Sequence, residues 1–274
     1  MYSTFFKPLF SDIKTFVLDT LFPISCLSCG QEGAFICADC KSTLTKLEHQ
    51  RCIVCQKNTP FGFTHPHCQT PWGADGLINF YDYHDQKVSK ILISGKYNFL
   101  PKVYEILGEI IAGKIQKEFP NLTPPAPSLS NFAEASSDLR EKEGVTAIAP
   151  PLFQRGGWEG FIVVPIPLHT SRQRWRGFNQ AEILCQSLNE NLGLACINVL
   201  VRCKITKTQK DLKKEGRLKN VANAFKLKPG ADVHNKNIIL VDDVTTTGAT
   251  LQDAAGVLKR NGAAKVICLT VARD

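Results

Sequence analysis

Two adjacent carboxylates, Asp242 and Asp243, close an apolar run and are followed by a series of hydroxyls. The stretch reads IILVDDVTTTGAT over residues 238–250. If a helix begins near Gly248, the loop before it aims backbone N–H groups and a helix N-terminus at one point, which suits a phosphate. The carboxylates could accept hydrogen bonds from sugar hydroxyls or orient Mg²⁺ through water. Together these features describe a site for a 5-phosphoribosyl group.

The hydroxyl-rich part would form the phosphate side of this site. Threonine hydroxyls are hydrogen-bond donors, and a glycine lets the backbone approach an anion closely. A threonine-rich turn in which an aspartate caps the helix is the plain structural alternative. The residues expected to contact the phosphate are Thr245, Thr246, Thr247, Gly248, Ala249 and Thr250.

A second set of chemically active residues lies nearer the start of the sequence. Seven of the eleven cysteines fall between residues 26 and 68, mostly as pairs with two residues between the cysteines. A pair of that spacing can place two sulfurs on one tetrahedral ion. We therefore expect two structural zinc sites, one with four Cys and one with three Cys and one His. The ligands would be Cys26, Cys29, Cys37, Cys40, Cys52, Cys55, His65 and Cys68.

Several features of this module stay open at the level of sequence. His67 could replace His65, because it lies next to Cys68. Consecutive and interleaved pairing of the four ligand pairs would use the same eight residues. Disulfides or a redox pair are the alternative to zinc, and the lack of a secretory signal disfavours them.

The rest of the chain alternates between apolar strands and amphipathic helices. Runs that are apolar on both faces are typical of a parallel sheet covered by helices. The expected fold class is therefore α/β, a parallel sheet flanked by helices and preceded by a small Cys-rich, zinc-ribbon-like module. Strands are expected at 161–167, 237–243 and 264–272, and helices at 87–97, 101–119, 179–192 and 248–262.

Local composition divides the chain into three parts. Residues 1–24 carry apolar positions at helical spacing and are expected to form an amphipathic helix. Residues 25–72 hold the zinc-binding module, and residues 77–274 form the larger domain. A Pro- and Ser-rich stretch at about 120–160 is expected to be a flexible insertion in that domain.

The bulk composition limits the classes of function. Hydrophobic residues make up 43% of the 274 positions, which is ordinary for a protein with a proper core. The net charge of +8 favours anionic partners such as phosphates or nucleic acid. No apolar run approaches the length of a membrane span. We expect a cytoplasmic protein, or one that is peripheral at the inner membrane face.

The stretch VDDVTTTGAT resembles the phosphoribosyl pyrophosphate (PRPP) binding motif of type I phosphoribosyltransferases. Other segments resemble the ComF/ComFC family of competence-associated, phosphoribosyltransferase-like proteins, which also carries an N-terminal Cys module. These segments are YDYHDQKVSKILISGKY at 81–97, VVPIPLHTSRQRWRGFNQAE at 163–182 and RCKITKTQKDLKKEGRLKNVANAF at 202–225. The resemblance implies that Asp242 and Asp243 hold the ribose 2′ and 3′ hydroxyls and that the following loop binds the 5′-phosphate.

The resemblance also implies a pyrophosphate side to the site, at the loop 168–177. Arg172, Arg174 and Arg176 would supply donors that suit phosphate oxygens, unless the loop is simply basic and solvated. Arg176 is favoured because it lies in the family-like RGFNQ. Lys96 is either a further phosphate partner or a surface lysine. Three more positions match the family without an assigned role, Gln209, Arg217 and Asn220.

These expectations lead to a protein that binds PRPP with Mg²⁺ and structural zinc, with an unidentified acceptor if it transfers the phosphoribosyl group. In that reaction a nucleophile would displace pyrophosphate at C1, and Asp242, Asp243 and Arg176 would be the catalytic residues. Two other functions use the same site. One is a factor that handles single-stranded DNA for the uptake machinery, and the other is a regulator that senses PRPP. Binding is expected more firmly than turnover.

Overall fold

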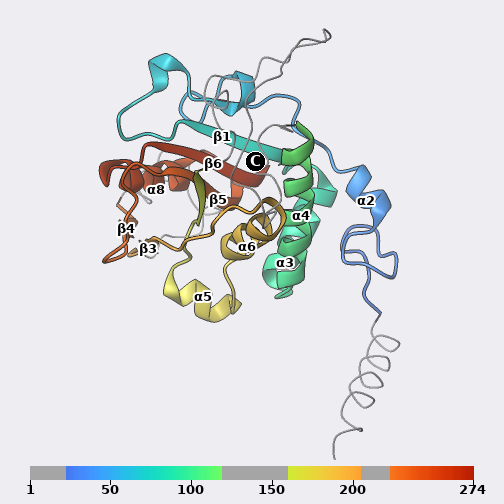
Figure 1. The fold of residues 1–274 in the computed structure, drawn as a ribbon. Coiled ribbons are helices and arrows are strands. Elements are labelled where there is room, and N and C mark those ends of the chain that lie inside the picture. Colours follow the sequence, from blue (N-terminus) through green and yellow to red (C-terminus); the bar gives the residue numbers. More distant parts are fainter. Residues whose placement is uncertain (1–22, 119–159, 205–222) are drawn as a thin grey trace, which may run out of the picture.

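A four-stranded parallel sheet forms the centre of the molecule, which is described by a computed structural model over residues 23–118, 160–204 and 223–274 (Figure 1). The strand order is β1-β6-β5-β2, and every neighbouring pair is parallel. The strands are β1 (Gly76–Asp82), β2 (Phe161–Pro165), β5 (Asn237–Thr245) and β6 (Lys265–Arg273). The apolar runs of β5 and β6 follow from this order, because a central parallel strand is buried on both faces.

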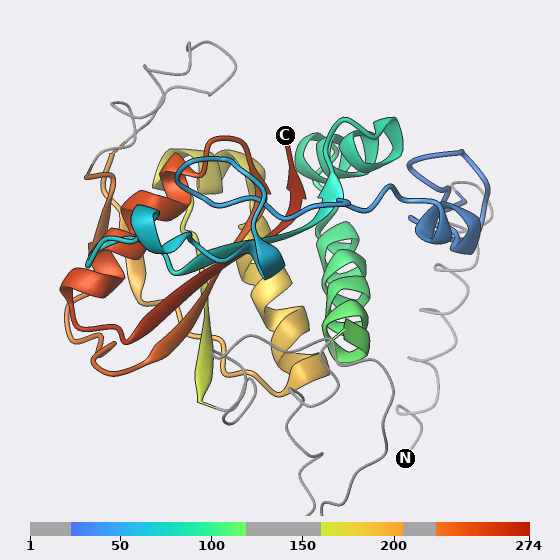
Figure 2. The same ribbon diagram turned by 90° about the horizontal axis from the view of Figure 1, so that it is seen from above.

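Helices cover both faces of the sheet (Figure 2). In β5, Ile239 and Val241 face a core shared with α3, α4 and α6, whereas Ile238 and Leu240 face a core shared with α8. The alternation follows from the strand period of two residues. The helices are α3 (Gln86–Tyr97), α4 (Pro101–Glu118), α6 (Gln180–Leu192) and α8 (Ala249–Arg260).

Smaller elements surround this framework. Strands β3 (Leu200–Arg202) and β4 (Phe225–Leu227) pair with each other in antiparallel fashion. The cysteine-rich part holds α2 (Ala38–Ser42) and two short 3₁₀ helices, η1 (Pro60–Gly62) and η2 (Pro66–Cys68). Another short helix, α5 (Thr170–Arg176), follows β2. Among the described residues, none of the helices is long and apolar enough to cross a membrane.

The structure confirms the α/β class and the expected strands and helices of the larger domain. It adds a strand that the sequence analysis did not expect, β1, in which Tyr81 pairs with Ala272 of β6. The expected helix at 1–24 lies outside the described residues except for its last two positions. The stretch at 120–160 lies outside them except for Gly160, which forms a turn before β2.

Candidate functional site

The loop between β5 and α8 lies at the carboxyl edge of the sheet, where α/β proteins bind ligands. We call residues 245–250 the phosphate loop. Helix α8 begins at Ala249, as expected, and Gly248 at its N-cap has a φ of 78°, which glycine adopts without strain. The backbone N–H of Ala249 donates to Thr247 Oγ1 at 3.4 Å. The loop therefore presents hydroxyls and the start of a twelve-residue helix in one place.

The two aspartates next to this loop are held by the backbone and by a lysine. Asp242 Oδ1 accepts from the N–H of Asp243 at 2.8 Å, and Asp243 Oδ1 accepts from the N–H of Val244 at 2.9 Å. Lys96 Nζ, from the last turn of α3, lies 2.5 Å from Asp243 Oδ2. Lys96 is therefore an ion-pair partner of the acidic pair, rather than a free surface lysine.

The charges of this cluster affect one another strongly. Burial and the neighbouring carboxylate of Asp243 raise the pKa of Asp242 to about 7. Burial acts to lower the pKa of Lys96, but the carboxylates of Asp243 and Asp242 outweigh it, so that the pKa of Lys96 is raised. Asp242 can therefore gain or lose a proton near neutral pH, while Lys96 stays charged.

The arginines expected on the pyrophosphate side lie on a helix, not in a loop. Helix α5 is capped by His169, whose ring nitrogen Nδ1 accepts from the N–H of Ser171 at 3.2 Å. Arg172 and Arg176 on α5 are half-buried, whereas Arg174 is exposed. Within the described parts of the chain, the Nε of Arg176 is buried and has no hydrogen-bond acceptor.

The arginines of α5 belong to the same electrostatic environment as the aspartates. The charges of Arg176, Asp243 and Asp242 all act on the pKa of Tyr104. Arg202 of β3 was not among the expected site residues. Its charge acts to lower the pKa of Asp242, and the charge of Arg172 acts to lower the pKa of Arg202. The only signal for Arg202 was its place at the start of the family-like segment 202–225. The other family-like positions, Gln209, Arg217 and Asn220, lie outside the described residues.

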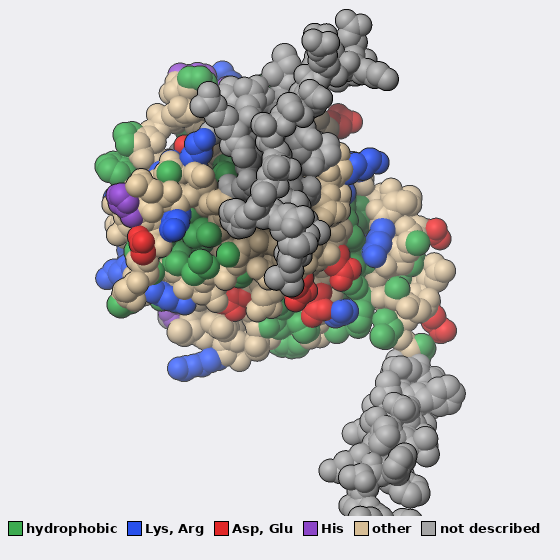
Figure 3. Space-filling model, viewed as in Figure 1, with side chains coloured by type: hydrophobic (Ala, Val, Ile, Leu, Met, Phe, Trp, Pro, Cys, Tyr) green, Lys and Arg blue, Asp and Glu red, His purple; other side chains and the backbone are tan. Residues whose placement is uncertain are grey.

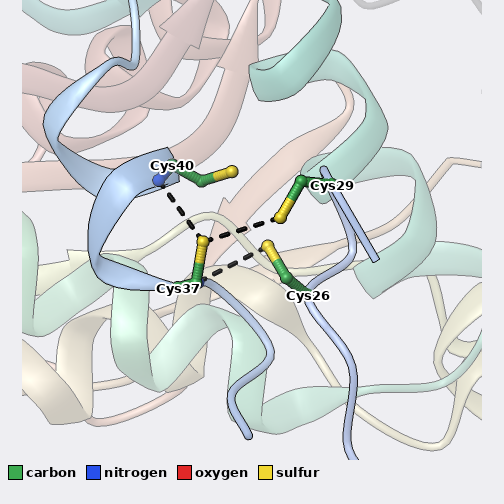
Figure 4. A group of neighbouring side chains, drawn as sticks. All are labelled: Cys26, Cys29, Cys37 and Cys40. Atoms are coloured by element: carbon green, nitrogen blue, oxygen red, sulfur yellow. Dashed lines mark hydrogen bonds between the residues drawn. The ribbon is translucent and has the colours of Figure 1, made fainter. Parts of the chain in front are cut away.

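The first cysteine cluster brings together the four residues of the first two pairs (Figure 4). The sulfurs of Cys29 and Cys37 lie 3.6 Å apart, and the N–H of Cys37 donates to the sulfur of Cys26 at 3.4 Å. Burial acts to raise the pKa of Cys26, but backbone N–H donors hold it at about 6. Such N–H donation stabilises thiolates, which are the form that binds metal.

The second cluster brings together Cys52, Cys55, His65 and Cys68. The Nδ1 of His65 lies 3.3 Å from the sulfur of Cys55, and its Nε2 lies 3.2 Å from the carbonyl oxygen of Asn58. A carbonyl on the outer ring nitrogen is the usual way in which a ligating histidine is oriented. His67 stacks on His65, with ring centroids 5.2 Å apart, and is not among the four grouped residues.

The eight residues therefore pair consecutively, and each cluster fits one zinc ion. In each, the four ligand atoms lie within 4.8 Å of one another. Sets of four Cys, or of three Cys and one His, match the donor preference and the tetrahedral geometry of structural zinc. The two clusters lie apart. The first packs beside α3, where Lys90 Nζ donates to the carbonyl oxygen of Ser28 at 2.9 Å. The second packs beside α8, away from α2 in Figures 1 and 2.

Comparison with known proteins gives two family matches. Residues 17–70 match the double zinc ribbon domain, and residues 176–274 match the phosphoribosyl transferase domain. The first match covers both cysteine clusters. The second covers the phosphate loop, the aspartates and Arg176.

Several curated proteins are similar to the chain. DNA utilization protein YhgH of Salmonella typhi is 42% identical over 105 residues, which are 38% of this chain and 45% of that protein. Competence protein F of Haemophilus influenzae is 37% identical over 113 residues, 40% of this chain and 49% of that protein. Competence protein ComFC of Bacillus subtilis is 40% identical over 115 residues, 42% of this chain and 45% of that protein. The chain thus spans just under half the length of these relatives.

Proposed function

Because this chain belongs to the family of competence protein F, ComFC and YhgH, with a double zinc ribbon ahead of a phosphoribosyltransferase domain, we propose that it binds PRPP with Mg²⁺. The observation that carries the proposal is the pair Asp242–Asp243 directly before a loop that ends at the N-terminus of α8. Carboxylates suit the ribose hydroxyls, and the helix N-terminus suits the phosphate.

Each part of the ligand has a matching set of side chains. Asp242 and Asp243 accept from the ribose hydroxyls, and Lys96 balances the charge of Asp243 at 2.5 Å. The 5′-phosphate binds to the phosphate loop. Its contacts would come from Thr245, Thr246, Thr247, Gly248, Ala249 and Thr250.

The pyrophosphate group faces α5 in this proposal. A buried guanidinium nitrogen without an acceptor is costly, so the Nε of Arg176 favours an anion nearby. Arg172 and Arg174 lie on the same short helix. Mg²⁺, when bound, would be held through the carboxylates and the ligand oxygens, and it would neutralise the charge of the pyrophosphate. If the protein also transfers the phosphoribosyl group, Asp242, Asp243 and Arg176 hold the sugar and the leaving group in place.

Calorimetric titration of PRPP with Mg²⁺ tests this proposal. The wild type should bind, and the variant Asp242→Asn/Asp243→Asn should lose at least tenfold in affinity, about 1.4 kcal/mol, because an amide accepts hydrogen bonds more weakly than a carboxylate. The control is Glu109→Gln/Asp232→Asn, which removes two charges at exposed positions outside the site. Equal affinity of the two double variants, or no binding to a zinc-loaded wild type, would contradict the proposal.

A second candidate function, binding of single-stranded DNA, is favoured by an exposed aromatic group beside the site. Trp175 is 55% exposed and makes edge contacts with Tyr97 at 6.0 Å and Phe99 at 5.4 Å between ring centroids. Such rings can stack bases, and the guanidinium of Arg176 lies 5.9 Å from the centre of the Trp175 ring. On the face shown in Figure 3, the described Lys and Arg side chains are interspersed with acidic ones, so this candidate depends on the aromatic group.

Fluorescence anisotropy with a labelled oligo-dT strand tests the second candidate. Trp175→Ala should weaken binding by about tenfold, since stacking on one ring contributes about 1–3 kcal/mol, and the affinity should fall as salt rises. Phe61→Ala, which removes an exposed aromatic ring of η1 outside the site, is the control. Equal losses in both variants would exclude the aromatic group as the binding site.

A further inference from the structure

The second zinc cluster lies directly against the phosphate loop. We call residues 52–56 the second knuckle; they hold Cys52 and Cys55 together with Ile53, Val54 and Gln56. We propose that Ile53 and Gln56 are positioning residues, which hold the phosphate loop in its anion-binding shape. The inference rests on the proposed function for the identity of the ligand, but not for the contact itself.

Ile53 packs onto the glycine of the phosphate loop. The Ile53 side chain is 2% exposed and belongs to the core beneath α8. A Cβ built at Gly248 would lie 2.7 Å from Ile53 Cγ1, closer than atoms can pack. Gly248 thus serves two needs, because its positive φ starts the helix and its missing side chain makes room for the knuckle.

Gln56 links the knuckle, the phosphate loop and the sheet. Its Nε2 donates to the carbonyl oxygen of Ile53 at 2.8 Å and to that of Thr247 at 3.4 Å. Its Oε1 accepts from Nη2 of Arg273, whose Nη1 donates to the carbonyl oxygen of Arg51 at 3.4 Å. Arg273 is 5% exposed and pairs in register with Thr245, the first residue of the loop.

Comparison of the two knuckles shows that Gln56 is not needed for the turn itself. In the first knuckle the equivalent position is Gly30, with a φ of 83°, and Gln56 has a φ of 64°. The N–H of each donates to the carbonyl oxygen of the first cysteine, at 2.8 Å to Cys26 and at 3.0 Å to Cys52. Glycine adopts this left-handed conformation without strain, whereas glutamine does so at a cost. The side-chain contacts of Gln56 offset that cost.

These contacts act on the part of the loop that must be rigid. A loop that binds an anion through several N–H groups binds more tightly when they already point at one place. Ile53 fixes Gly248, and Gln56 fixes Thr247. Cys52 and Cys55 of the knuckle would hold zinc together with His65 and Cys68, so metal binding and ligand binding should support each other.

Hydrogen exchange of the ligand-free protein tests the contact without assuming a ligand. In Gln56→Gly the knuckle should keep its turn and its zinc, since glycine already occupies this position in the first knuckle. The amides of residues 246–250 should nevertheless exchange faster, by roughly five- to tenfold, and the affinity for PRPP with Mg²⁺ should fall by a similar factor. Unchanged exchange at these amides would overturn the inference.

A matched pair of truncations separates this role from general destabilisation. Ile53→Ala and Leu27→Ala change the same position of the second and the first knuckle, and Leu27 packs against the core on the other face of the sheet. Only Ile53→Ala should speed exchange at residues 246–250 and weaken PRPP binding. Equal effects of both would show that the loop responds to any loss of packing, and the proposal would be wrong. If the wild type binds no PRPP, the proposed function fails, and the exchange data still decide on the contact.

Discussion

At the scale of single residues, the site depends on a carboxyl group whose charge is finely balanced. Asp242 lies between a like charge on Asp243 and positive charges on Lys96 and Arg202. Burial and Asp243 raise its pKa to about 7. A small change in its surroundings, such as a bound cation, would therefore change its charge at neutral pH.

This balance predicts that PRPP binding depends on pH. In the proposed complex the carboxylate form of Asp242 would accept hydrogen bonds from the ribose, so the affinity should fall below pH 7 by up to about tenfold per pH unit. Titrations at pH 6, 7 and 8 measure this. In Asp242→Asn the remaining pH dependence belongs to the ligand, whose own phosphates titrate near pH 6. Identical profiles in both proteins would contradict the prediction.

The same group should affect stability with a defined sign. Its pKa in the folded protein, about 7, lies above the ordinary aspartate value of 3.8, so the folded state holds the proton more tightly. The stabilisation is fully present below the unfolded value and is lost as the pH rises through about 7. Ligand-free Asp242→Asn should therefore lose less stability than the wild type between pH 5 and pH 8.

At the scale of elements, the zinc ribbon repeat provides two clusters with different surroundings. The first packs beside α3, and the second packs beside α8 and the phosphate loop. Each cluster contains all of its own ligands, because the pairs are consecutive along the chain. The two metal sites should therefore be independent.

Metal content tests this independence. The wild type should hold two zinc ions. The single variants Cys40→Ser and Cys68→Ser should each hold one, since a set of three ligands binds zinc much more weakly than a set of four. Native mass spectrometry counts the ions. Cys203→Ser, which changes an exposed cysteine outside both clusters, should keep two. Loss of both ions from either ligand variant would mean that the clusters are coupled.

At the scale of the whole molecule, the sequence allowed the sheet and the ligand sets to be predicted because their signals are local. The apolar run of β5, the capping glycine of α8 and the spacing of the cysteine pairs each lie within a short segment. The sequence alone does not show which cysteine pairs share a zinc site, or whether His65 or His67 is the ligand. Only the fold decides both questions. The ion pair of Lys96 with Asp243 joins residues from distant segments and carried no local signal.

Strand β1 was missed for a physical reason of the same kind. Its sequence GLINFYD is interrupted by Asn79, which reads as a loop residue. In the structure Asn79 is 1% exposed, and its Oδ1 accepts a hydrogen bond from Thr270 Oγ1 at 2.7 Å. The side-chain amide of Gln50 forms hydrogen bonds with the backbone N–H and carbonyl oxygen of Asn79. A polar residue in a buried strand is acceptable only when such partners exist, and they come from elsewhere in the chain.

The strand order has a consequence for synthesis of the protein on the ribosome. Strand β6 follows the other three strands of the sheet along the chain, yet it lies between β1 and β5. Asn79 and Thr270, which bond across β1 and β6, are separated by 191 positions. Until β6 leaves the ribosome, β1 has no partner in the sheet, and the edge of β1 that will pair with β6 is open to aggregation. The nascent chain thus carries its zinc ribbons and a strand without its neighbour in the sheet until β6 is made, and β6 then completes the sheet.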